Sequence, residues 1–285
     1  MDPTGINHQR IMIVTGANSG MGLATTIALA KEGCKVIMVC RSRERGATAY
    51  QGALKQSGSS DIELMHGDLG SLESTRTFAR AFKAKYSHLD GLINNAGVVA
   101  IKRQTTEDGF EVQLGVNHLG HFLLTRLLLD ELQRAPQGRV VVVSSGAHKV
   151  GSIYWDDPFF TQGYSFWKGY AQSKLANILF TKELARRLQG TRVTVNSLHP
   201  GAVGTSLGVN RKTGFGKSIL AFLGLFFLTP EEGAQTALYL ATSEEVAGIS
   251  GEYFYKKKIA PVSAKAQDAQ QARLLWEWSE QQVGL

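Results

Sequence analysis

Cysteine and proline are scarce in this chain of 285 residues, which has two of the former and six of the latter. Cys34 and Cys40 bound an apolar run with β-strand character. In an extended strand they would lie about 20 Å apart, too far for a disulfide bond. Reduced thiols predict a cytoplasmic protein. No proline-rich linker or repeat divides the sequence, so we expect one domain over residues 1–285.

Long apolar runs are missing as well. The longest, residues 215–228, has 14 residues, whereas a membrane-spanning helix needs roughly 20. Residues 1–10 are polar and lack the apolar core of a signal peptide. We therefore expect no transmembrane span.

The composition excludes a disordered or fibrous chain, because 43% of the residues are hydrophobic and only 19% are charged. The formal net charge is +7. This excess favours an anionic ligand, a membrane surface or a nucleic acid only weakly, and a solvated basic surface explains it equally well. We expect no nucleic-acid partner.

Short β-rich runs alternate with longer helical patterns along the chain. The runs cover residues 11–15, 35–40, 62–66, 91–94, 139–144, 192–198 and 252–255. The helical patterns cover residues 22–31, 43–55, 71–86, 110–133, 171–189 and 230–242. Several strands are apolar on both faces, which is typical of a parallel sheet covered by helices on both sides. We predict a doubly wound, Rossmann-type α/β fold with a seven-stranded, mainly parallel sheet.

A glycine-rich turn follows the first predicted strand and precedes a helix. Its pattern is Gly-x-x-x-Gly-x-Gly, formed by Gly16, Gly20 and Gly22. In this strand-turn-helix context, glycines let the backbone approach a pyrophosphate, whose charge the helix amino terminus stabilises. The turn predicts a dinucleotide site with the contact residues Gly16, Asn18, Ser19, Gly20, Met21 and Gly22.

The end of the second strand bears on cofactor choice. An NAD-binding chain usually carries an acid there, whereas this sequence reads Cys40-Arg41. Arg41 could bind a 2′-phosphate through paired hydrogen bonds, which favours NADP, although a solvated helix start is the alternative. Asp68 and Leu69 follow the third strand and could contact the adenine, and Asp68 is equally explained as a helix-start signal.

Three tyrosines have a lysine four residues later, starting at positions 164, 170 and 253. Tyr170 opens a long amphipathic helix, whereas Tyr253 lies on a predicted strand and Tyr164 in an aromatic loop. At a spacing of four, Lys174 lies on the same helical face and could lower the pKa of the Tyr170 phenol. The sequence therefore favours Tyr170 and Lys174 as the reactive pair.

Taken together, these motifs resemble the short-chain dehydrogenase/reductase superfamily, most closely its retinol dehydrogenase branch. The resemblance also rests on the runs 94–97 (Asn-Asn-Ala-Gly), 117–122 (Asn-His-Leu-Gly-His-Phe), 143–145 (Val-Ser-Ser) and 199–201 (His-Pro-Gly). It implies a tetrad in which Tyr170 is the general acid/base, Ser145 holds the substrate oxygen, Lys174 contacts the nicotinamide ribose and Asn117 anchors a proton-relay water.

The resemblance implies further contacts and partners. It adds to the cofactor site the residues Asn95, Ala96, Gly97, Tyr170, Lys174, Pro200, Gly201, Val203 and Thr205. A homo-oligomer is implied through the helices carrying Asn117 and Tyr170. The superfamily most often has isoleucine where this chain has Met21, a small apolar change.

Two apolar segments are candidates for a substrate wall. Residues 151–169 hold seven aromatics in 19 positions, which fits either an apolar wall beside Tyr170 or a structural cover. Residues 215–228, within a predicted substrate lid over 204–228, would be buried, close over the site or contact a bilayer surface.

No metal site is expected. His118 and His121 have helical spacing, but no Cys, Asp or Glu ligand pattern accompanies them, so packed or capping histidines explain them better.

The predicted function is hydride transfer between NADP(H) and a lipophilic aldehyde, ketone or alcohol of retinoid, steroid or fatty type. Two alternatives stay open at this point. One is an enzyme similar to protochlorophyllide reductase, although that family's longer insertions are missing here. The other is a non-catalytic NADP(H)-binding sensor or scaffold.

Overall fold

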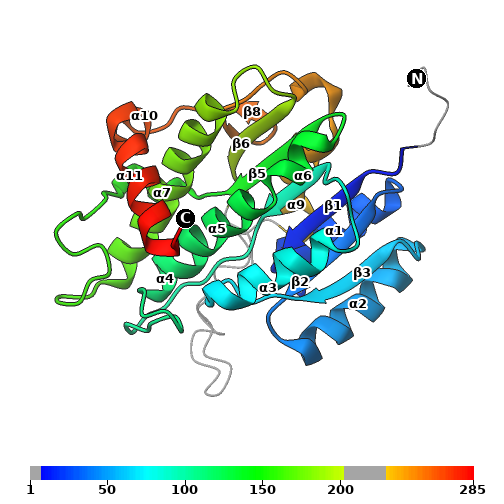
Figure 1. The fold of residues 1–285 in the computed structure, drawn as a ribbon, viewed down its shortest axis with the longest axis horizontal. Helices are drawn as coiled ribbons and strands as arrows, with labels where there is room; N and C mark the ends of the chain where they lie inside the picture. The colour runs from blue at the N-terminus through cyan, green and yellow to red at the C-terminus, as the bar shows by residue number, and fades with distance from the viewer. Residues whose placement is uncertain (1–7, 202–228) are drawn as a thin grey trace.

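The computed structural model describes residues 8–201 and 229–285. Its centre is one sheet in the order β3-β2-β1-β4-β5-β6-β7-β8, parallel from β3 to β7 (Figure 1). The strands are β1 Ile11–Thr15, β2 Lys35–Cys40, β3 Ile62–His66, β4 Gly91–Asn94, β5 Gly138–Val143, β6 Val193–His199, β7 Tyr253–Tyr255 and β8 Lys258–Ile259.

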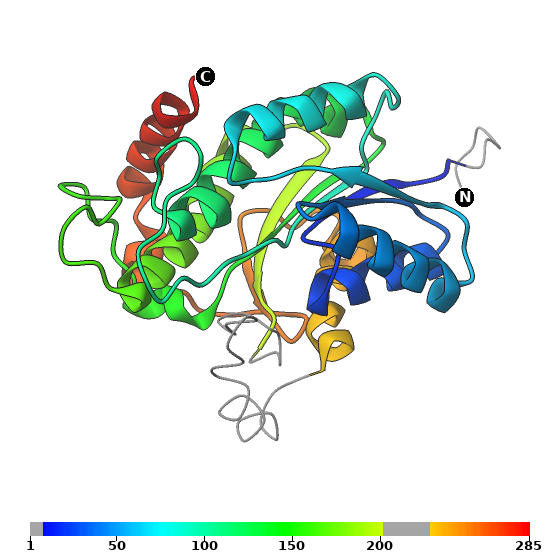
Figure 2. The ribbon, with the colours of Figure 1, turned by 90° about the horizontal axis from the view of Figure 1, so that it is seen from below.

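Helices cover both faces of the sheet (Figure 2). The described helices are α1 Gly20–Lys31, α2 Arg43–Ser57, α3 Leu72–Lys83, α4 Val112–Leu114, α5 Gly120–Leu127, α6 Leu129–Arg134, α7 Phe166–Arg187, α9 Pro230–Thr242, α10 Ala264–Gln267 and α11 Ala269–Val283. Shorter turns are the π-helical η1 Gly115–Leu119 and the 3-10 segments η2 Gly146–Val150 and η4 Glu244–Val246. The predicted doubly wound α/β fold is confirmed.

The two-sided burial follows from the sequence of each central strand. In β1, Ile11 and Ile13 join the core cluster that includes α3, α5 and α7, whereas Met12 and Val14 join the one that includes α1 and α9. Successive side chains of a strand point to opposite faces, so a continuous apolar run supplies both cores at once.

The predicted count of seven strands is wrong by one. Lys256 and Lys257 both have positive φ, +50° and +62°, and reverse the chain so that β8 pairs antiparallel with β7. Two left-handed residues at the centre of a turn define the tight hairpin that matches strand twist. Because Asn-Gly or Asp-Gly usually supplies this turn, a lysine run gives no such signal.

The predicted helix over residues 110–133 is also corrected. The structure divides it into α4, the π-helical η1, α5 and α6. The π-helical turn contains Asn117 and His118 and lies beside the candidate site, which is where such insertions are frequent.

The carboxyl-terminal helix α11 lies across α5 and α7 (Figure 1). Buried Trp276 contacts Phe122 and Phe180 with ring centroids 5.0 and 6.0 Å away, and Arg187 lies over the indole at 4.3 Å. Ser279 bonds His118, and Glu280 pairs with Arg126. Association through the helices carrying Asn117 and Tyr170 stays a prediction, and it would have to form beside α11 or displace it.

None of the helices within the described ranges combines the length and the apolarity that crossing a membrane requires.

Replacing Trp276 with alanine should lower the free energy of unfolding by about 3–5 kcal/mol, because it removes a large ring from between two helices. Leu274→Ala, on the same helix at 42% exposure, is the control and should change stability by about 0.5 kcal/mol or less. Urea unfolding followed by circular dichroism measures both. Equal effects would mean that α11 is not anchored through Trp276.

Candidate active site

A cavity of about 1080 Å³ opens at the carboxyl ends of the parallel strands. This is where open α/β sheets bind ligands, at the point where the strand order reverses between β1 and β4. It is lined by the predicted residues Gly16, Asn18, Ser19, Gly20, Met21, Gly22, Arg41, Asp68, Leu69, Asn95, Ala96, Gly97, Ser145, Tyr170, Lys174, Pro200 and Gly201. Val203 and Thr205, like the predicted lid 204–228, lie outside the described residues.

The glycine turn is packed so closely that side chains cannot replace its glycines. A Cβ on Gly22 would lie 2.4 Å from Asn95 Nδ2 and 2.5 Å from the Gly16 carbonyl oxygen. Gly16 has a φ of +64°, and a Cβ there would lie 2.9 Å from Ala96 Cα. The glycines therefore let the turn pack directly against Asn95 and Ala96, and the same glycines line the cavity at the start of α1, where a helix amino terminus fits a pyrophosphate.

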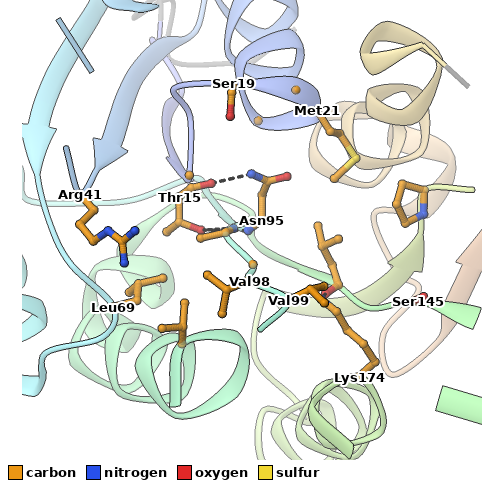
Figure 3. A pocket seen from close by; sticks show the side chains of 18 of the residues that line it. Thr15, Ser19, Met21, Arg41, Leu69, Asn95, Val98, Val99, Ser145 and Lys174 are labelled. Carbon is orange, nitrogen blue, oxygen red and sulfur yellow. Dashed lines mark hydrogen bonds between the residues drawn. The ribbon is translucent and has the colours of Figure 1, made fainter. Parts of the chain in front are cut away.

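Thr15 joins this turn to the end of β4 (Figure 3). Its hydroxyl oxygen accepts hydrogen bonds from the backbone N–H groups of Asn95 and Ala96, both at 2.9 Å. The Asn95 side-chain amide in return donates to the Thr15 carbonyl at 2.7 Å. These bonds give Asn95 and Ala96 a positioning role at the centre of the cavity.

Arg41 lies at one end of the cavity (Figure 3), and its neighbours along the chain Ser42 and Arg45 also line the cavity. Arg41 is more than half exposed, and its Nε lies 4.0 Å from a carboxylate oxygen of Asp68. An acid therefore does lie beside this arginine, although it comes from the segment after β3 and not from the end of β2. Asp68 Oδ1 accepts from the Gly70 N–H, and Ser71 caps α3, so Asp68 is not the helix cap.

Ser145, Tyr170 and Lys174 lie at the other end. Lys174 is 4% exposed; its ammonium donates to the Val143 carbonyl at 3.1 Å and lies 5.5 Å from the Tyr170 ring centroid. Asn177, one turn further along α7, donates to the same carbonyl at 3.1 Å. The end of β5 thus fixes the helix that carries the tyrosine and the lysine.

In the protein alone, Lys174 is not among the groups that shift the pKa of Tyr170, so a lowering of this pKa by Lys174 stays a prediction for the protein with its cofactor bound. Burial raises the pKa of the phenol, and a hydrogen bond with Ser145 offsets only part of this rise. Burial also lowers the pKa of Lys174 to about 8. Both groups are thus biased toward their neutral forms, because low-dielectric surroundings disfavour charge.

Asn117 is fully buried and does not line the cavity. Its side-chain oxygen accepts from the Val98 N–H at 2.8 Å, and its amide nitrogen donates to the Val98 carbonyl and to the Ser173 hydroxyl. Ser173 in turn donates to the Tyr170 carbonyl at 2.8 Å. The side chain therefore holds the segment after β4 against the tyrosine helix, and the water-anchoring role implied by the resemblance stays a prediction.

The aromatic segment 151–169 serves mainly as a cover. Phe166 and Trp167 line the cavity and are 42% and 52% exposed. The other five pack elsewhere: Phe159 stacks on Phe110, Trp155 and Phe159 contact Trp278, and Tyr164 donates to the Ala100 carbonyl. The remaining two are Tyr154 and Phe160, which contact each other.

His118 and His121 do not converge on one point. His118 bonds Ser279, whereas His121 contacts Thr15 and the Asn117 carbonyl. Burial lowers their pKa values to about 3 and about 4. Among the described residues, His8, His88 and Asp90 do group their potential ligand atoms within 4.8 Å, but at the amino ends of the strands, away from the cavity.

Two residues of the site have roles that the sequence did not indicate. Thr15 and His121 each appear in a motif, but only their contacts reveal a role. Phe166 and Trp167 belong to the aromatic segment expected as a substrate wall, and Arg45 follows Arg41 and Arg43 in one basic run.

Comparison with known proteins identifies the class. A family model described as short chain dehydrogenase matches residues 10–214. Retinol dehydrogenase 14 of Homo sapiens is 47% identical over 100% of this chain and 89% of its own length. Retinol dehydrogenase 13 of Homo sapiens is 46% identical over 97% and 85%. The chain therefore belongs to the short-chain dehydrogenase family and is an oxidoreductase similar to retinol dehydrogenases.

Solved structures agree. An uncharacterized protein from Mycobacterium paratuberculosis superposes with a TM-score of 0.79 at 37% identity, covering 97% of this chain and 94% of its own. A short chain dehydrogenase from Escherichia coli CFT073, complexed with NADPH, gives 0.69 at 25% identity, covering 87% and 97%. The family and the glycine turn together indicate a nicotinamide dinucleotide cofactor.

Gly22→Ala should abolish measurable dinucleotide binding, because the new Cβ would collide with Asn95 and the Gly16 carbonyl. Gly52→Ala is the matched control: its Cβ would meet only the flexible Gln56 end at 3.8 Å, inside α2. That change should keep binding intact and raise stability by about 0.5–1 kcal/mol. Cofactor fluorescence titration and thermal melting distinguish the two, and normal binding by Gly22→Ala would contradict the packing argument.

Proposed function

We propose that this chain is an NADP(H)-dependent oxidoreductase acting on a lipophilic aldehyde, ketone or alcohol, with retinoids as the first substrates to test. The observation that carries the proposal is one cavity with Tyr170, Ser145 and Lys174 at one end and Arg41 with Arg45 at the other. Retinol dehydrogenases 11 to 14, 41–47% identical in their human forms, support the lipophilic class.

A bound nicotinamide would supply the hydride to a carbonyl carbon, or take it from an alcohol. In reduction, the Tyr170 hydroxyl gives its proton to the carbonyl oxygen, and the Ser145 hydroxyl donates a hydrogen bond to the same oxygen. Lys174 would hold the nicotinamide ribose. Because burial raises the pKa of Tyr170, the protonated phenol needed for reduction is the stable form in the protein alone.

The preference for NADP rests on charge at the adenosine end. Arg41 and Arg45 contribute two positive charges beside the cavity, and Asp68 contributes one negative charge. The net positive charge of these three side chains favours a phosphate at the ribose 2′ position. Arg41 could bind this phosphate through a pair of charge-assisted hydrogen bonds.

The lipophilic substrate class is supported at the other end. Phe166 and Trp167 present partly exposed rings beside Tyr170, and Trp167 lies 6.4 Å from the Tyr170 ring centroid. Val98, Val99 and Ala147 add apolar lining. An apolar wall with a few polar groups at one point is typical of sites that orient a lipophilic ligand.

Tyr170→Phe should lower kcat with retinal and NADPH by about 10²- to 10⁴-fold, because it removes only the hydroxyl that exchanges a proton. NADPH affinity should stay the same. Tyr253→Phe is the control, since Tyr253 is buried, shares the lysine spacing and does not line the cavity. Nicotinamide absorbance measures turnover. If the unmodified chain binds NADPH without turnover, the sensor or scaffold alternative is favoured. Light-dependent reduction of a protochlorophyllide would instead favour the alternative of an enzyme similar to protochlorophyllide reductase.

Arg41→Ala should lower kcat/KM for NADPH by about tenfold or more and leave NADH almost unchanged, because a charge-assisted hydrogen bond contributes roughly 1.5–3 kcal/mol. Arg43→Ala is the matched control, two residues along and outside the cavity lining. Steady-state kinetics with both cofactors decides. Equal losses with NADH and NADPH would mean that Arg41 does not read the 2′-phosphate.

A further inference from the structure

His121 lies between the dinucleotide turn and the segment that carries Asn117. It is 1% exposed and sits in the first turn of α5. Its Nε2 is 2.8 Å from the Thr15 hydroxyl oxygen, and its Nδ1 is 3.1 Å from the Asn117 carbonyl oxygen. Neither His121 nor Thr15 belongs to the predicted tetrad.

The contacts determine the protonation of the ring. A carbonyl oxygen can only accept, so Nδ1 carries the hydrogen and donates to Asn117. In the neutral ring Nε2 then accepts, and Thr15 donates its single hydroxyl hydrogen to it at 2.8 Å, the shorter of two contacts, since the Ile93 carbonyl oxygen lies 3.3 Å from the same hydroxyl. The Thr15 oxygen keeps its two lone pairs for the N–H groups of Asn95 and Ala96. Burial, which lowers the pKa of His121 to about 4, keeps the ring neutral at physiological pH.

Thr15, His121 and Asn117 form a continuous chain of hydrogen bonds that attaches to the segment after β4 at two points. Thr15 holds that segment at Asn95 and Ala96, and Asn117 holds it at Val98 through both atoms of its side-chain amide. His121 forms hydrogen bonds with both Thr15 and Asn117. Gly97, between the two attachment points, is so placed that a Cβ there would lie 3.6 Å from Asn117 Oδ1 and 3.8 Å from the Lys174 ammonium.

We propose that His121 is a positioning residue that couples the cofactor turn to the catalytic end of the cavity. Through Thr15 it holds the turn against which the dinucleotide binds, and through the Asn117 carbonyl it holds the π-helical segment that braces Ser173 and the tyrosine helix. It transfers no proton to substrate, because both ring nitrogens are engaged and the ring is buried. This inference rests on the proposed function.

Two substitutions each remove one of the two hydrogen bonds that the His121 imidazole forms with Thr15 and Asn117. Asparagine has its amide nitrogen near the position of Nδ1, so His121→Asn keeps the donor to Asn117 and loses the Thr15 contact. Glutamine reaches to the position of Nε2, so His121→Gln keeps an acceptor for Thr15 and loses the donor to Asn117. Each variant therefore tests one side of the coupling.

NADPH affinity by fluorescence titration, kcat at saturating NADPH with retinal, and thermal melting are measured on the full chain. His121→Asn should weaken NADPH binding by about fivefold with little change in kcat, since one neutral hydrogen bond is lost from the cofactor turn. His121→Gln should keep NADPH affinity and lower kcat by about fivefold or more. Thr15→Val combined with His121→Asn should bind NADPH no more weakly than Thr15→Val alone.

His118→Asn is the matched control, because His118 is equally buried three residues earlier and bonds Ser279 of α11 instead of the site. It should lower the melting temperature without separating affinity from kcat. The proposal is overturned if both His121 variants change the two parameters together in proportion to lost stability, or change neither. A chain that binds NADPH but turns over no carbonyl or alcohol would refute the proposed function instead, while the two affinity measurements would still test the Thr15 half of the coupling.

Discussion

The Thr15 hydroxyl is the interaction on which the site depends. Between β1 and β4 the strand order reverses, which is where open α/β sheets form a ligand crevice at the carboxyl ends of the strands. Thr15 accepts from the N–H groups of Asn95 and Ala96, and the Asn95 N–H also contacts the Ile93 carbonyl at 2.9 Å. A hydroxyl offers two acceptor positions and one donor. All three are used, so this one buried hydroxyl joins the end of β1 to the segment after β4 and to His121 of α5.

From this point the cavity divides into an exposed end and a buried end with different electrostatics. Arg41 is largely solvated, so its charge acts on a ligand phosphate without a large desolvation cost. Lys174 and Tyr170 are desolvated, and burial alone shifts the pKa of each toward the neutral form. Polar or charged groups brought by ligands therefore have their largest effect at this end, because an interaction inside a low-dielectric site is poorly screened.

The sequence was most informative where the same residues determine both the local backbone conformation and the packing of the whole fold. The central strands were found because continuous apolar runs fit only a sheet buried on both faces, and the glycine turn because of its place between a strand and a helix. The β7-β8 hairpin was missed because Lys256 and Lys257 adopt positive φ without a glycine or an asparagine. The roles of Thr15 and His121 depend on contacts 80 and 106 residues away, which no local pattern encodes.

The break in the predicted helix 110–133 has the same origin. Its apolar spacing favours one continuous helix. Gly120, however, lies directly against the loop between β3 and α3, because a Cβ at position 120 would lie 2.4 Å from the Leu69 carbonyl oxygen. Leu69 lines the cavity, so this approach brings the cavity wall onto the first residue of α5. One residue later, His121 contacts Thr15. A side chain at position 120 would push α5 outward and separate that pair. The glycine is therefore required by the distance between two elements, and the π-helical turn lets the chain meet that distance while keeping Asn117 against Val98.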